Sequence, residues 1–413
     1  MKRKFYKAAS ITKVLFENGI ELLPSVTELF ELELAYLEHK AINKNEFLER
    51  TAYFKSLNGM PSKHFLLYSE QPEVLNESRS TTTQNYFENG QFATGYATHS
   101  LFPYRGKFHP QLIKGLINIL GIKKGETILD PMCGSGTLNV EAALMGINSF
   151  AIDVSPFCQF MTITKFEALR IDKDTLLKHI DKPNELFELF SNKGVIHQMK
   201  RMFSTVELRV YQLALLAFLD AMGYAKRVEK SSHKQLFPKV LRRYKETVFN
   251  LITNPNYNPK TLGNVQVLKK SEALNIELKK NSVDCVITSP PYSFAIDYAE
   301  NDKDQLEYLG FDTKVLRDKM VGLKGKGKDE KLKNYFADME TYCSEVSRVL
   351  KKGKYFVMII GSNTNQTGGI RLEDKIIDAG KKFKLNLVKS IVKPIKGMRN
   401  TMKDEYILFF EKK

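Results

Sequence analysis

TILDPMCGSGT, residues 127–137, is the stretch that decides the fold, because an apolar strand there ends in a turn that contains two glycines. Residues 138–145 continue with the pattern of a helix. A strand that leads through such a turn into a helix N-terminus offers backbone N–H groups to a ligand, and glycine lets the ligand approach the main chain closely. No lysine follows the glycines and their spacing is not GxGxxG, so neither a triphosphate loop nor the dinucleotide fingerprint fits. Asp130 instead favours a ligand with an amine or a positive charge.

Strands and helices alternate beyond this turn. The strand at 149–153 ends on Asp153, where a carboxylate can accept hydrogen bonds from ribose hydroxyls. Further apolar strands are predicted at 265–268, 283–287 and 355–360. Apolar strands separated by helices predict a mostly parallel sheet that is covered on both faces. Segments 385–391 and 406–410 have no room for a helix between them, which predicts an antiparallel hairpin at the sheet edge.

VITSPPY, residues 286–292, ends one of these strands on a rigid elbow. Two adjacent prolines lock φ and donate no backbone hydrogen bond, so the strand must stop there. The elbow could be a mere strand stop, or it could be the wall of a pocket for a flat ligand, with Tyr292 as an aromatic face. Asp297 and Tyr298 follow shortly afterwards and either shape that pocket or begin the next helix.

The two motifs together resemble a known family. DPMCGSGT is similar to the S-adenosylmethionine-binding motif of the amino-methyltransferases, and TSPPY is similar to their catalytic motif; these enzymes methylate exocyclic amines of DNA bases. Residues 97–113 resemble the family's segment that closes over the methionine end of the cofactor. Residues 345–354 resemble the helix-turn-strand after the catalytic motif, and 398–407 the terminal hairpin. The resemblance runs from about residue 95 to the end, outside a helical insertion.

The resemblance implies an α/β, Rossmann-like class I methyltransferase fold. Its sheet would be seven-stranded and mostly parallel with an antiparallel C-terminal hairpin, joined by a helical N-terminal region and a helical insertion. S-adenosyl-L-methionine is the implied cofactor, and no metal is implied. After the 265–268 strand the family often has an acid that meets the adenine amine, a place that Ser271 or Glu272 could fill. The residues expected to bind the cofactor are Thr98, His99, Phe108, Asp130, Pro131, Met132, Cys133, Gly134, Ser135, Gly136, Thr137, Asp153, Val154, Ser271 and Glu272.

Ser289, Pro290, Pro291 and Tyr292 are the predicted catalytic residues. An exocyclic amine is a poor nucleophile, because its lone pair is delocalised into the ring of the base. The Ser289 hydroxyl and the Pro290 carbonyl are acceptors that can hold both amine hydrogens and favour the pyramidal nitrogen that attacks the methyl group. Tyr292 would stack on a base rotated out of the duplex. No general base is needed if the proton leaves after methyl transfer.

The first residue of the elbow indicates the target base. In the family, SPPY serves mostly N4 of cytosine, whereas DPPY and NPPY serve mostly N6 of adenine, some RNA guanines and protein glutamine. The resemblance therefore favours a site-specific DNA methyltransferase that makes N4-methylcytosine, within a restriction-modification or defence system. The alternatives are an N6-adenine DNA methyltransferase, an RNA base methyltransferase and, outside enzymes, a catalytically silent nucleic-acid-binding subunit.

The net charge of +16 favours a polyanionic partner. Residues 226–245 contain eight basic residues and one acid, and residues 314–333 contain eight basic residues and three acids. Double-stranded DNA is the expected partner, with a restriction endonuclease as a possible second one. An exposed helix face and a solvated loop would show the same charge pattern. The predicted nucleic-acid contacts are Arg242, Arg243, Lys324, Lys326 and Lys328.

Residues 1–90 are expected to form a helical region and residues 91–413 the catalytic domain, with a polar linker at 76–84. Segment 158–262 is too long for one crossover, reads as helical, and is the candidate target-recognition region. No run approaches the roughly 18 apolar residues of a membrane span, and no signal peptide is recognised. The four cysteines lack the spacing of a zinc site or a disulfide framework. A cytoplasmic protein without membrane association is expected.

Overall fold

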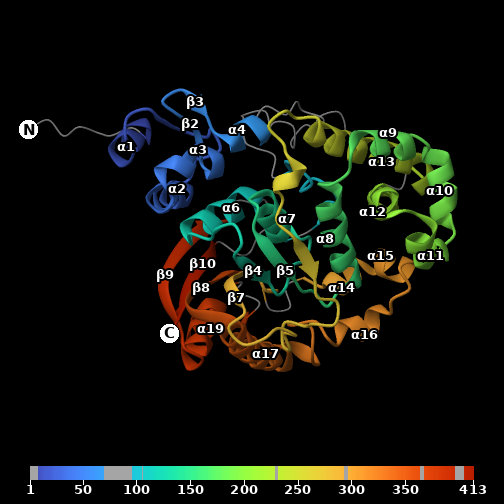
Figure 1. Ribbon diagram of the computed structural model, residues 1–413. Helices are drawn as coiled ribbons and strands as arrows, with labels where there is room; N and C mark the ends of the chain where they lie inside the picture. The colour runs from blue at the N-terminus through green and yellow to red at the C-terminus, as the bar shows by residue number, and fades with distance from the viewer. Residues whose placement is uncertain are drawn as a thin grey trace, which may run out of the picture.

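The computed structural model describes residues 8–68, 95–104, 106–227, 231–292, 296–362, 367–395 and 404–413. A seven-stranded sheet with the order β6-β5-β4-β7-β8-β10-β9 forms its centre (Figure 1). The strands are β4 (Thr127–Asp130), β5 (Asn148–Ala151), β6 (Val265–Val267), β7 (Val283–Thr288), β8 (Leu350–Gly361), β9 (Leu385–Pro394) and β10 (Asp404–Lys412).

The pairing of the strands confirms the predicted fold. The five strands from β6 to β8 pair in parallel, whereas β10 pairs antiparallel with both β8 and β9. This is the Rossmann-like class I methyltransferase arrangement, with an antiparallel C-terminal hairpin. Residues 398–403 of the expected hairpin motif lie outside the described residues. The strand order reverses between β4 and β7, and ligands bind at such a switch point, beyond the carboxyl ends of the strands.

Successive side chains of the central strands enter cores on opposite faces of the sheet, as the pleat requires. Ile128 packs in one core and Leu129, its neighbour in β4, packs in another. All six residues of β7 are buried, which fits a largely apolar strand that contains only Asp284 and Thr288 as polar residues. The helices that cover the two faces are α6 (Pro110–Ile119), α7 (Thr137–Leu144), α8 (Pro156–Ala168), α17 (Gly327–Val349) and α19 (Leu372–Lys382).

The N-terminal region packs on the catalytic sheet. Its helices were predicted, but its three-stranded antiparallel sheet was not, because these strands are only three, four and two residues long. Phe54 and Leu34 are fully buried in the same core as Ile128 and Ile407. The boundary expected near residue 90 and the linker at 76–84 lie outside the described residues. The elements are α1 (Ala8–Leu15), β1 (Ile20–Leu22), α2 (Leu29–Ala41), η1 (Lys44–Glu46), α3 (Phe47–Arg50), β2 (Phe54–Leu57), β3 (Met60–Pro61) and α4 (Lys63–Tyr68).

Helices fill the interval between β5 and β6, as predicted for segment 158–262. The first of them, α8, packs against α7 and β6 as a crossover helix, and the others lie beside the sheet (Figure 1). These others are α9 (Lys173–Ile180), α10 (Pro183–Ser191), α11 (Val195–Met202), α12 (Thr205–Arg227), α13 (His233–Ile252) and η2 (Pro259–Thr261). Among the described helices, none is long and apolar enough to cross a membrane.

Three short helices follow the elbow and complete the core of the insertion. They are α14 (Tyr298–Asn301), α15 (Lys303–Tyr308) and α16 (Thr313–Arg317). Leu306 and Leu316 are buried in one core with Leu213 and Leu219 of α12. The chain that leaves the elbow is therefore packed on the insertion.

Candidate functional site

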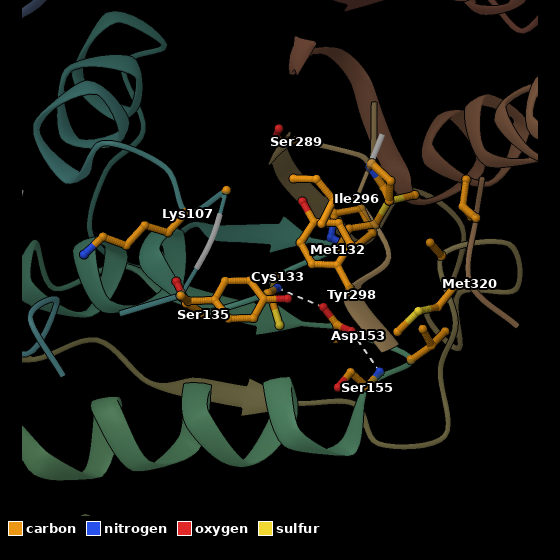
Figure 2. Close-up of a pocket in the computed structure, with 18 of the residues that line it drawn as sticks. Lys107, Met132, Cys133, Ser135, Asp153, Ser155, Ser289, Ile296, Tyr298 and Met320 are labelled. Carbon is orange, nitrogen blue, oxygen red and sulfur yellow. Dashed lines mark hydrogen bonds between the residues drawn. The ribbon is translucent and has the colours of Figure 1, made fainter. Parts of the chain in front are cut away.

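A cavity opens at the carboxyl ends of β4 and β7, at the point where the strand order reverses. Residues 131–135 of the glycine turn line it, and so do Ser289 and Pro291 of the elbow. Figure 2 shows Ser289 and Asp153 among the side chains around this cavity. The two motifs lie far apart in the sequence, and the adjacency of β4 and β7 brings them to one site.

The glycine turn holds its backbone close to the cavity. Gly134 has φ 49° and Gly136 has φ 74°, in the left-handed region that favours glycine. A Cβ atom at Gly136 would lie 2.6 Å from Thr162 Oγ1, so only glycine fits between the turn and α8 without displacement. A Cβ atom at Gly134 would lie 3.3 Å from the ring of Tyr104, which also lines the cavity. The turn then enters α7 at Thr137, another lining residue.

Asp153 connects two loops at the wall of the cavity. One carboxylate oxygen accepts a hydrogen bond from the Gly134 N–H at 2.9 Å, and the other accepts one from the Ser155 N–H at 2.8 Å (Figure 2). Burial raises the pKa of Asp153 to about 6, although these two bonds oppose the rise. Each carboxylate oxygen has a further lone pair, so Asp153 can still accept ribose hydroxyls. That role stays a prediction; Val154, also expected here, lines the cavity beside it.

Asp130 is fully buried behind the cavity and joins the two motifs. Its Oδ1 accepts hydrogen bonds from Thr288 Oγ1 at 2.8 Å and from the Met132 N–H at 3.2 Å. Its Oδ2 is buried with no hydrogen-bond partner in the described part of the chain. Burial raises the pKa of this carboxyl to about 7. Asp130 therefore ties the glycine turn to the residue before Ser289, whereas the amine-binding role expected of it stays a prediction.

Hydrogen bonds from two neighbouring elements hold the elbow. Ser289 Oγ donates to Tyr292 Oη at 3.2 Å, and Tyr292 Oη donates to Glu405 Oε1 of β10 at 2.9 Å. Tyr335 of α17, which is fully buried, donates to the Pro291 carbonyl at 3.0 Å. The ring of Tyr292 is half-buried against the core that includes Tyr335. Pro290 links Ser289 and Pro291, the two elbow residues that line the cavity.

The segment before the glycine turn reaches the cavity through Tyr104, Lys107 and Phe108. Thr98 and His99, also expected at the cofactor, are buried behind this wall. His99 Nε2 lies 2.7 Å from Glu141 Oε1 of α7, and burial lowers the pKa of His99. Lys107 Nζ donates to the His99 carbonyl at 3.0 Å, so His99 supports the segment that faces the cavity.

Ser271 and Glu272, the two candidates for the adenine end of the cofactor, have different surroundings. Glu272 lines the cavity, with Lys319 Nζ at 2.8 Å from its Oε1. Ser271 is only 1% exposed, and its Oγ accepts a hydrogen bond from the Glu277 N–H at 2.9 Å. Glu272 therefore faces the cavity and Ser271 shapes the turn beside it, whereas the adenine-binding role expected of one of them stays a prediction.

The predicted nucleic-acid contacts fall into two groups. Arg243 Nη2 donates to the buried carboxylate of Asp220 at 2.6 Å, and Lys324 Nζ lies 3.0 Å from Asp338 Oδ2, so both bind acids of the fold. Arg242 has a side chain that is 71% exposed, and its Nε lies 3.9 Å from Oε1 of Glu246 on the same helix surface. The remaining two, Lys326 and Lys328, are exposed at the start of α17. These three keep their charge at the surface.

Two aromatic residues pair at the cavity, of which one was singled out in the sequence. Tyr298 lines the cavity, whereas Asp297 caps α14 by accepting a hydrogen bond from the Glu300 N–H at 3.1 Å. The ring of Tyr298 stacks on Tyr104, with centroids 6.0 Å apart. Tyr104 was missed, and so was Lys107. The available signal was the run Phe102-Pro-Tyr104, an aromatic pair around a proline outside any expected strand.

The lining residues fit S-adenosylmethionine. Asp153 offers a carboxylate of the kind that ribose hydroxyls need, and Met132, Val154 and Leu274 offer apolar surface of the kind that a purine ring needs. The glycine turn allows close approach to the main chain. These three features together suit a nucleoside-bearing cofactor.

Two family models match the chain, the RMKL-like methyltransferase domain over residues 100–205 and the DNA methylase over residues 283–413. The Type II methyltransferase M.BsoBI of Geobacillus stearothermophilus is 25% identical over 397 residues, covering 81% of this chain and 75% of that protein. The Type II methyltransferase M.MjaII of Methanocaldococcus jannaschii is 32% identical over 117 residues, 28% of this chain and 22% of that protein. The tRNA (guanine(10)-N2)-dimethyltransferase of Methanothermobacter thermautotrophicus is 37% identical over 79 residues, 17% of this chain and 24% of that protein.

The matches and the cavity agree with one another. The RMKL-like domain match contains the glycine turn, and the DNA methylase match contains the elbow, the two motifs that line one cavity. The sheet topology, the cavity and the matches thus support a DNA methyltransferase that uses S-adenosylmethionine.

Proposed function

We propose that this protein transfers the methyl group of S-adenosylmethionine to N4 of a cytosine rotated out of double-stranded DNA. The observation that carries the proposal is the meeting of the glycine turn and Ser289 in one cavity. A serine at this place of the elbow favours cytosine, because the resembling enzymes with SPPY act mostly on cytosine N4. The relatives named as Type II methyltransferases support DNA as the substrate, and we propose a restriction endonuclease as partner.

The residues of the elbow supply orientation rather than acid–base chemistry. When bound, the cofactor supplies an electrophilic methyl group on a sulfonium. Ser289 Oγ and the Pro290 carbonyl accept the two amine hydrogens and direct the nitrogen lone pair toward the cofactor end of the cavity. Tyr335 fixes the Pro291 carbonyl and so holds the elbow rigid. Tyr292 offers the exposed part of its ring to the base, which must leave the duplex to reach this site.

The helical insertion, α9 to α13, is the proposed target-recognition region. Arg242 lies on its surface with a side chain that is 71% exposed, and phosphate contacts from such residues would set the position of the duplex. The short helices after the elbow pack on this insertion, which supports a link between the proposed recognition region and the chain that leaves the catalytic motif.

Product analysis tests the proposal. Protein incubated with labelled S-adenosylmethionine and genomic DNA is expected to yield N4-methylcytosine after digestion to nucleosides and mass spectrometry. Ser289→Ala should lower transfer about 100-fold or more and leave cofactor affinity unchanged. N6-methyladenine as the only product would refute cytosine as the target, and full activity of Ser289→Ala would refute the assigned site.

An RNA base is the second candidate substrate. The match to the tRNA (guanine(10)-N2)-dimethyltransferase favours it. Parallel incubation with transfer RNA separates the two candidates, since label in RNA and none in DNA would replace DNA as the substrate.

A further inference from the structure

We propose that Glu405 is a positioning residue, an inference that rests on the proposed methyl transfer to an amine. With Lys393 and Tyr292 it fixes the Ser289 hydroxyl as a hydrogen-bond acceptor toward the target amine. Glu405 and Lys393 lie on the C-terminal hairpin, outside both motifs.

Four polar groups form a continuous chain that ends at the cavity. Lys393 Nζ donates to Glu405 Oε2, and Glu405 Oε1 accepts a hydrogen bond from Tyr292 Oη at 2.9 Å. Tyr292 Oη accepts one from Ser289 Oγ at 3.2 Å, and Ser289 lines the cavity. The side chains of Lys393 and Glu405 are 25% and 18% exposed, so the ion pair is largely shielded from water.

The direction of this chain follows from the chemistry of its members. An ionised carboxylate only accepts hydrogen bonds, so the single proton of the Tyr292 hydroxyl must point at Glu405. Burial and the Glu405 carboxylate raise the pKa of Tyr292 well above its usual range, which keeps that proton in place. The oxygen of Tyr292 then accepts the proton of Ser289. With its own proton committed, Ser289 Oγ presents lone pairs to the cavity.

A reversed chain would oppose catalysis. If Tyr292 donated to Ser289, the serine proton would be free to point at the target, and a donor would face the amine hydrogens. An amine needs acceptors for its hydrogens to become pyramidal, so the direction set by Glu405 matters for methyl transfer. The backbone holds Glu405 firmly, because it pairs with Gly361 of β8 on one side and with Lys393 of β9 on the other.

Glu405→Gln tests the inference, because a glutamine amide can donate to Tyr292 and reverse the chain without a change of size. The single-turnover rate of methyl transfer is expected to fall about 10- to 100-fold, the usual effect of losing a partner that orients a functional group. The KM for S-adenosylmethionine should stay within about twofold, because no cofactor-binding residue is changed. The matched control is Glu411→Gln on the same strand, which removes an ion pair with Lys413 away from the cavity and should transfer at the wild-type rate.

Tyr292→Phe provides the second variant. It keeps the ring for stacking, removes the hydroxyl that receives the Ser289 proton, and should lower the rate by a similar factor. The double variant should be no slower than the slower single one, because both changes break one chain. A wild-type rate in Glu405→Gln, or additive losses in the double variant, would overturn the inference and leave the proposed function standing. No transfer by the wild-type protein to DNA or RNA would overturn both.

Discussion

At the scale of single residues, Asp130 carries the clearest dependence on pH. Its pKa is about 7 in the fold against 3.8 ordinarily, so between these values the folded state binds more protons than the unfolded state. The free energy of unfolding should therefore fall as the pH rises from about 4 to about 7, with a contribution from Asp130 on the order of 4 kcal/mol. Asp130→Asn removes this contribution, because the amide stays neutral at every pH.

Urea unfolding at pH 5 and pH 8, without cofactor, measures the effect. The decline in unfolding free energy from pH 5 to pH 8 should be smaller in Asp130→Asn than in the wild type. The control Asp174→Asn, at an exposed position on α9, should decline as the wild type does. An equal decline in all three proteins would mean that Asp130 does not carry its proton in the fold.

Gly136 is the second residue with a sharp expectation. Gly136→Ala places a methyl group 2.6 Å from Thr162 Oγ1 at a positive φ, so the turn must shift. We expect affinity for S-adenosylmethionine to weaken at least about tenfold, measured by calorimetric titration. Gly121→Ala is the matched control, since Gly121 also has a positive φ (65°) but has open space around its Cβ position. It should lose only about 1 to 2 kcal/mol of stability and keep its affinity.

Much of the cavity was predictable from the sequence, because the glycine turn and the elbow are contiguous motifs. Pro131, Met132 and Ser289 line the cavity as expected. Tyr104 was missed although the run Phe102-Pro-Tyr104 marked it, whereas Glu405 escaped prediction because it acts through a hydrogen bond with Tyr292, which is distant in sequence. No local pattern marks the contact of Glu405.

At the scale of elements, two adjacent arginines of α13 are expected to have different roles, one in stability and the other in DNA binding. Arg243 binds Asp220, whose side chain is 4% exposed, and Tyr244 Oη donates to the same carboxylate oxygen at 3.2 Å. Arg243→Ala should lower the free energy of unfolding by about 3 kcal/mol, because a buried acid loses its cation. Arg242→Ala should leave stability unchanged and weaken DNA binding equally for all sequences. The slope of the logarithm of the binding constant against the logarithm of the salt concentration should become smaller in magnitude by about one.

Chemical denaturation and fluorescence anisotropy at several salt concentrations distinguish the two arginines. Each variant serves as the control for the other, since the positions are adjacent on one helix. Unchanged DNA affinity in Arg242→Ala would remove this face of α13 from the proposed interface.

The central strands were predictable at this scale and the small N-terminal sheet was not. Residues 283–287 form a largely apolar segment with one acid, Asp284, and the structure has β7 there, buried on both faces. By contrast, β1 has only three residues, which alternate between partly buried and exposed. A strand this short cannot show the two-residue period of hydrophobicity in the sequence. Its pairing with β2 depends on tertiary contact.

At the scale of the whole molecule, the N-terminal region and the catalytic sheet share a core. Phe54 of β2 is fully buried with Ile113 of α6 and Ile407 of β10. Phe54→Ala should lower the free energy of unfolding by about 3 to 5 kcal/mol and keep a single transition by circular dichroism. Phe311→Ala is the control, because Phe311 is 43% exposed and should change stability little. Two separate transitions in Phe54→Ala would show instead that the N-terminal region unfolds independently.

The packing of α14 to α16 on α12 has a consequence for exchanging specificity between related enzymes. Leu306 and Leu316 come from beyond the elbow, yet they complete the interior of the helices that precede β6. A chimera that transplants only the segment between β5 and β6 would leave these side chains facing foreign surfaces. The transplantable unit is discontinuous, and a working graft must carry residues 298–323 together with residues 169–263.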